Sequence, residues 1–88
     1  MKNKKLSFSR PFEKAFERLP QDIREAAYDK LVLFLDNPKH PSLRVKRMKG
    51  TDAIWEMSIT MNYLLTFEIH SDEIFLRKIG THNILSSP

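Results

Sequence analysis

The chain has 88 residues and a net charge of +4, with 15 lysines and arginines against 11 acidic residues, so we expect one small domain over residues 1–88. The absence of cysteine excludes disulfides, thiolate nucleophiles and cysteine zinc sites. No apolar stretch reaches the roughly 18 residues of a membrane span, and no apolar run follows the basic N-terminus as in a signal peptide, so we expect a soluble, cytoplasmic protein without membrane contact.

Residues 4–8 are predicted to form a short strand, with Leu6 and Phe8 on one face. Ser9 then suits the N-cap of a helix, whose first turn tolerates Pro11. The buried stripe of this helix falls at positions i, i+4 and i+7, which are Phe12, Phe16 and Leu19.

Pro20 ends the first helix and suits the first turn of a second one, which we expect to run to about Asp36. Its apolar stripe is Ile23, Ala27, Leu31, Phe34 and Leu35. The segment "DNPKHP" at 36–41 breaks the chain, because a proline disfavours helix in the residue before it.

The remainder predicts strands at 43–49, 54–60, 63–69 and 73–79, with a hairpin joining the second and third of these. The last strand alternates imperfectly. Either Ile74 and Leu76 face the core or Phe75 and Ile79 do, unless a β-bulge reconciles the two patterns.

This order of elements predicts an α+β domain: an N-terminal strand, then a two-helix hairpin packed on one face of a mostly antiparallel, twisted sheet. We expect the other face to be at least partly open to solvent. Its side chains are polar, namely Ser58, Thr60, Asn62, Thr66 and Glu68. Leu64 lies among them and breaks the pattern.

The candidate functional residues are a basic segment and a histidine. Residues 39–50 hold five cations and no acid: Lys39, Arg44, Lys46, Arg47 and Lys49. His82 follows Gly80, which ends the last predicted strand. Cations that neutralise phosphate beside a histidine that moves protons near neutral pH would suit RNA.

Each feature also has a purely structural interpretation. A basic run is commonly a solvated face, and a histidine after a strand is commonly a turn residue. The three histidines, His40, His70 and His82, show no metal-ligand spacing, so no metal and no cofactor is expected.

The chain resembles the RelE/ParE superfamily of toxins from type II toxin–antitoxin systems, and among them the YafQ-like and plasmid-stabilisation members. The resemblance covers nearly the whole length and rests on the order of its pieces. They are "FSRPFEKAFERLPQDIREAAYDKLVLFLDNPKHPSL", "MKG", "IWEMSITMNYLLTFEI" and "EIFLRKIGTH", with the pair "NY..TF.I" and "IGTH" the most specific.

The resemblance implies a microbial-RNase-like fold and a ribonuclease that cuts mRNA in the ribosomal A site without a metal. In that chemistry the ribose 2′-OH attacks the adjacent phosphate, which needs a base, an acid and cations. His82 takes the place of the motif histidine, as acid or base, and Lys78 that of a phosphate contact. RNA contacts fall on Lys46, Arg47, Lys49, Asn62 and, less clearly, Arg77. Ser58 stands where YafQ-like members carry a second histidine.

Leu64 stands where many members of the superfamily carry an arginine that holds the scissile phosphate. Three explanations are open: an inactivating substitution, a normal variant that relies on other groups, or part of a surface that binds an antitoxin. We favour the first, because an apolar residue does not fit a polar face.

Three functions follow from the resemblance: an mRNA-cleaving toxin, a ParE-like gyrase inhibitor, or a degenerate toxin that acts only in a repressor complex. His82 disfavours the second, whereas Leu64 and Ser58 favour the third. All three imply a cognate antitoxin as partner, with operator DNA bound only through it.

Overall fold

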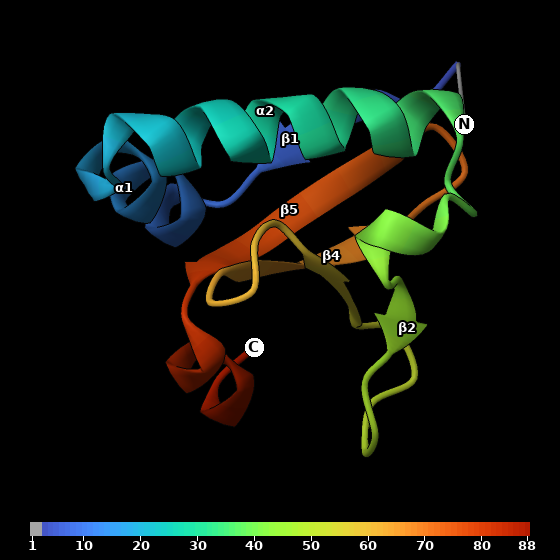
Figure 1. The fold of residues 1–88 in the computed structure, drawn as a ribbon. Coiled ribbons are helices and arrows are strands. Elements are labelled where there is room, and N and C mark those ends of the chain that lie inside the picture. The colour runs from blue at the N-terminus through green and yellow to red at the C-terminus, as the bar shows by residue number, and fades with distance from the viewer. Residues whose placement is uncertain (1–2) are drawn as a thin grey trace.

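The computed structural model describes residues 3–88, so the first two residues of the expected domain lie outside it. Five strands form one sheet in the order β1-β5-β4-β3-β2 (Figure 1). The strands are β1 (Lys5–Phe8), β2 (Lys46–Arg47), β3 (Trp55–Ser58), β4 (Leu64–Ile69) and β5 (Glu73–Gly80). β1 pairs with β5 in parallel, and the other pairs are antiparallel. The predicted α+β class and mostly antiparallel sheet are confirmed.

Two helices, α1 (Arg10–Arg18) and α2 (Gln21–Asp36), lie together on one side of the sheet (Figure 1). The side-chain oxygen of Ser9 caps α1 by accepting a hydrogen bond from the Phe12 amide at 3.1 Å, as its residue type predicts. Pro20 separates the two helices, because it lacks an amide donor but fits the start of α2.

The core forms where the helices meet the sheet. Phe34 of α2 meets Phe67 of β4 edge-on, with the ring centroids 5.0 Å apart. The other buried core residues come from both helices, the facing sides of the strands, the segment before β2 and the β3–β4 turn: Phe12, Ala27, Leu31, Leu43, Met57, Ile59, Leu65, Ile74, Leu76 and Ile79. Odd-numbered residues of β3 and β4 therefore face the helices, as the predicted alternation requires.

β5 contains a β-bulge at Arg77. Thr66 lies opposite Lys78, and the next residue of β4, Phe67, lies opposite Leu76, so Arg77 is the extra residue. The bulge explains why the last strand alternates imperfectly. Ile74, Leu76 and Ile79 are all buried, whereas Phe75 lies on the other face with Glu68.

The strand predicted at 43–49 is largely wrong. Only Lys46 and Arg47 form β2, and a 3₁₀ helix, η1 (Pro41–Leu43), precedes it. His40 caps η1 and Arg44 ends it with a left-handed backbone, so Leu43 turns inward and becomes fully buried. A buried leucine and a turn thus replace the first half of the predicted strand.

The sheet face away from the helices is less open than predicted. A second 3₁₀ helix, η2 (His82–Ser86), follows β5, and the tail returns toward the sheet (Figure 1). The hydroxyl of Thr66 donates to the Pro88 carbonyl oxygen at 3.1 Å, and Thr66 is fully buried. Leu64 is only 4% exposed. The expectation of a solvated face therefore fails for these two residues, because the tail covers that part of β4.

Ser9 links the start of α1 to the bulge in β5. Besides capping the helix, its hydroxyl donates to the Arg77 carbonyl oxygen at 2.6 Å. We expect Ser9→Ala to lower the free energy of unfolding by about 2 kcal/mol, since both the cap and this bond are lost. Urea denaturation measures the change. Ser86→Ala, which removes one exposed local bond, is the control, and an equal loss in both variants would contradict a special role for Ser9.

Candidate functional site

A pocket of about 390 Å³ lies where α2, η1, the β3–β4 hairpin and the start of η2 come together. Its polar and ionisable lining comes from separate segments: Lys30, Ser42, Arg44, Glu56, Ser58, Thr60, Tyr63 and His82. Leu64 forms part of the apolar lining with Ile59 and Met61. The volume falls within the range of pockets that bind small ligands or single nucleotides.

Glu56 places a carboxylate in this pocket. It is opposite Lys46 on one side and Thr66 on the other, and Thr66 is opposite Lys78. These four residues form one row across β2, β3, β4 and β5, because directly paired residues share a face. The Lys46 ammonium lies 3.8 Å from the Glu56 carboxylate, whose side chain is 17% exposed. Glu56 therefore carries a partly shielded negative charge with one cation beside it.

His82 brings an imidazole to the same pocket. It is exposed and begins η2, two residues after β5 ends at Gly80. Gly80 is opposite Leu64, and a Cβ atom on Gly80 would lie 2.9 Å from the Ile84 side chain. Only a glycine lets Ile84 pack this closely, which turns the chain and positions His82 beside the hairpin.

The tail also engages Arg77, one of the predicted RNA contacts. The Arg77 Nε atom donates to the Pro88 carbonyl oxygen at 3.1 Å, and its Nη1 atom forms an ion pair with the Glu68 carboxylate. His70 contacts the other oxygen of this carboxylate at 2.9 Å. Arg77 is thus held on the outer sheet face by Glu68 and the tail, and it does not line the pocket.

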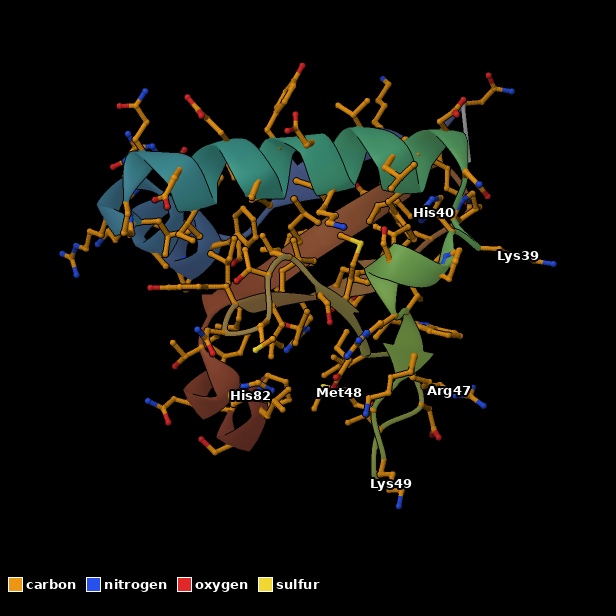
Figure 2. The ribbon with its side chains drawn as sticks, viewed as in Figure 1. Lys39, His40, Arg47, Met48, Lys49 and His82 are labelled. Carbon is orange, nitrogen blue, oxygen red and sulfur yellow. The ribbon has the colours of Figure 1, made fainter. Side chains whose placement is uncertain are left out.

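The other predicted site residues divide into two groups. Lys46 and Lys78 share the row of Glu56, although neither lines the pocket itself. Arg47, Lys49 and Asn62 lie elsewhere. Arg47 stacks over the Trp55 ring at 5.8 Å, and Figure 2 shows it pointing outward on the side away from His82, with Lys49 at the tip of the turn after β2. Asn62 is exposed in the hairpin turn.

Two charged pocket residues, Lys30 and Glu56, carry no prediction as site residues, and Arg44 was predicted only as one cation of the basic segment. Glu56 had a signal, since it alternates with Trp55 and Met57 and so belongs to the polar face of its strand. Lys30 had none, because a single lysine on an amphipathic helix is ordinary. Its place in the pocket depends on how α2 packs over η1.

Two further features of residues 3–88 bear on function. The structure brings together no three histidine or acidic side chains suited to hold a metal ion in this range. Neither described helix is long and apolar enough to cross a membrane.

No protein-family model matches the sequence, and a search of curated proteins found no match. Solved structures do match. The YoeB/ParE toxin from Agrobacterium tumefaciens has a TM-score of 0.75 at 15% identity, over 89% of this chain and 98% of that one. YafQ in the E. coli DinJ–YafQ complex has a TM-score of 0.75 at 13% identity, over 94% and 97%. The E. coli RelBE complex has a TM-score of 0.71 at 20% identity, over 89% and 95%.

The chain has the RelE-like fold. Coverage is nearly complete on both sides, so the likeness extends over the strand, the helix pair and the rest of the sheet. The expected RelE-like architecture is therefore confirmed at the level of the fold. Two of these three structures are toxin–antitoxin complexes, RelBE and DinJ–YafQ.

The Glu68 carboxyl makes the free energy of unfolding depend on pH. Burial raises its pKa, but hydrogen bonds and positive charges from Arg77 and His70 outweigh burial and hold the pKa below the ordinary value of 4.5. As pH falls through 4.5, the unfolded chain binds this proton before the folded one does. The stabilisation from Glu68 is therefore complete above that pH and is lost as pH falls toward the folded-state pKa.

We expect Glu68→Gln to remove the stabilisation that ionised Glu68 provides and that is lost at low pH. Its free energy of unfolding should lie below that of the parent protein at pH 7, and the difference should shrink between roughly pH 5 and pH 3. Urea denaturation at a series of pH values measures it. Curves that stay parallel over this range would show that Glu68 titrates alike in the folded and unfolded states.

Proposed function

We propose that this protein is the toxin of a type II toxin–antitoxin system and cleaves mRNA in the ribosomal A site, which inhibits translation in the cytoplasm. The single observation that carries the proposal is the meeting of a carboxylate, Glu56, and an imidazole, His82, in one pocket of a RelE-like fold. A proton acceptor and a proton donor are what cleavage by the ribose 2′-OH requires.

The proposed reaction proceeds by in-line attack of the ribose 2′-oxygen on the adjacent phosphorus. Glu56 accepts the 2′-OH proton, the new O–P bond forms, and the bond from phosphorus to the 5′-oxygen breaks. Protonated His82 donates its proton to the departing 5′-oxygen. The products are a 2′,3′-cyclic phosphate and a 5′-hydroxyl, and both residues recover their starting states by proton exchange with water. As proposed, this chemistry requires no metal ion.

The negative charge of the phosphorane-like transition state would be stabilised by cations in the row that contains Glu56. Lys46 and Lys78 lie at its two ends, on the same sheet face. The Lys46 ammonium also lies 3.8 Å from the Glu56 carboxylate. Leu64 occupies the central position of the neighbouring row, between Ser58 and Gly80, where a cation would reach the same phosphate.

The proposed partners follow from the function. A cognate antitoxin would hold the toxin inactive, as the RelB and DinJ partners in the similar solved structures suggest. Operator DNA would be bound only through that antitoxin. The substrate would be mRNA presented by the ribosome, because a single carboxylate–imidazole pair without the usual arginine is a sparse catalytic set for free RNA.

Primer extension on programmed ribosomes tests the function with His82→Ala and Leu64→Arg. We expect His82→Ala to slow cleavage by about 10²–10⁴-fold, since it removes the proton donor. We expect Leu64→Arg to accelerate cleavage by up to about 10²-fold, because it restores a charged donor at the transition state. Leu64→Met, which keeps an apolar side chain of similar volume, is the control and should match the parent protein.

Loss of the Leu64→Arg gain when His82→Ala is added would support one shared site. If none of these proteins cleaves mRNA, the ribonuclease proposal is wrong. The alternatives are then a degenerate toxin that acts only with its antitoxin on operator DNA, which the burial of Leu64 and the capture of Arg77 by Glu68 favour, or a ParE-like gyrase inhibitor. Repression of the operator and supercoiling by gyrase distinguish these two.

A further inference from the structure

The pocket has a second charged region that the proposed chemistry does not use. Lys30 of α2 and Arg44, which follows η1, both line the pocket that contains His82 and Glu56. They come from the segment between the helices and β2, whereas His82 comes from the end of β5. Figure 2 shows His40, two residues from Ser42, well separated in the view from His82. The two cations and the imidazole thus reach the pocket from different parts of the chain.

Lys30 is held in place by a small hydrogen-bond network. Its ammonium donates to the Ser42 hydroxyl at 3.0 Å, and that hydroxyl lies 2.8 Å from the His40 Nδ1 atom. The same Nδ1 atom accepts a hydrogen bond from the Ser42 amide at 3.2 Å. One of the three Lys30 donors is therefore used for positioning, and two are left for another acceptor.

Arg44 adopts a backbone conformation that a non-glycine residue rarely takes. Its φ is 49°, in the left-handed region, which costs an arginine more than a glycine. An exposed turn at this point would accept glycine or asparagine with less strain. An arginine there is consistent with use of the side chain, because strained backbone is retained where a side chain has a task.

The charges of Lys30 and Arg44 are not balanced within the pocket. Glu56 is the pocket's carboxylate, and its ion pair is with Lys46. Among the ion pairs within residues 3–88, none includes Lys30 or Arg44. Two cations without an ion pair among residues 3–88 line one cavity, so the group that they would bind there is an anion.

We infer that Lys30 and Arg44 form a second phosphate subsite, which binds a phosphodiester next to the scissile one and sets the position of the RNA strand relative to His82. This inference rests on the proposed function for the identity of the anion. The two cations contact a phosphate that does not react, so they contribute to substrate binding equally in the ground state and the transition state. They raise affinity without accelerating the chemical step.

A binding experiment with RNA that cannot be cleaved tests the subsite. The probe is a tetraribonucleotide with a 2′-deoxy sugar at the cleavage position, and its affinity is measured by NMR titration of the protein amides. A second probe carries a neutral methylphosphonate in place of the flanking phosphate. The variants are Lys30→Gln and Arg44→Gly, and the second also relieves the left-handed strain. Lys14→Gln, which changes an exposed cation on α1, is the control.

We expect Lys30→Gln and Arg44→Gly each to weaken binding of the phosphate probe roughly tenfold, as loss of a charge-assisted hydrogen bond does. Both should bind the methylphosphonate probe as weakly as the parent protein does. The control should bind both probes like the parent. On ribosomes the two variants should raise KM and leave kcat unchanged.

Three results would overturn the subsite: undetectable binding of the phosphate probe by the parent protein, equal losses with both probes, or losses no greater than those of Lys14→Gln. These outcomes are separable from failure of the proposed function. Cleavage that depends on His82 but not on Lys30 or Arg44 would reject the subsite alone. Phosphate-dependent binding without any cleavage would reject the ribonuclease alone.

Discussion

The β-bulge at Arg77 is the feature on which the two faces of the sheet depend. Without the extra residue, Leu76 and Ile79 would fall on opposite faces of β5, and one of them would leave the core. With it, both are buried, and Arg77 and Lys78 follow one another on the outer side, where Arg77 forms an ion pair with Glu68 and Lys78 is opposite Thr66. A regular strand cannot place two consecutive side chains on one face. The bulge therefore completes the core and concentrates positive charge outside it.

Leu64 is explained by packing as well as by its position in the proposed site. It is opposite Gly80, where the missing side chain leaves room for Ile84, and the tail bonds the neighbouring Thr66 through Pro88. The tail thus covers the part of the outer face that holds Leu64 and Thr66. The sequence pattern of a leucine on a polar face was a sign of this cover. It does not conflict with the proposed lost phosphate contact, since one position can pack in one protein and carry a charge in another.

The parts of the fold that local chemistry determines could be predicted. Both helices, with Ser9 as the cap and Pro20 between them, and the hairpin follow from periodicity and turn residues. The turn at η1 could not, because Leu43 is buried by contacts with distant residues while its neighbours read as a strand. His82 was predicted as a site residue from its place after Gly80, and it lines the pocket. Glu56 was recognisable only as part of a polar strand face and Lys30 not at all, because the packing of separate segments brings them to one pocket.

The pocket places Glu56 on a paired strand and His82 on a short helix, which suits the proposed proton transfer beside a phosphate. Glu56 is on β3, which pairs with β2 on one side and β4 on the other, so ladder hydrogen bonds determine its position. His82 is on a short 3₁₀ helix that packs on the sheet through Ile84, which leaves its ring exposed to a substrate. Because Lys46 faces the carboxylate, the net positive charge of the pocket comes from Lys30 and Arg44. In the proposed reaction, one cation beside Glu56 and two others for the RNA would separate catalysis from binding, which a single cation shared by both tasks could not do.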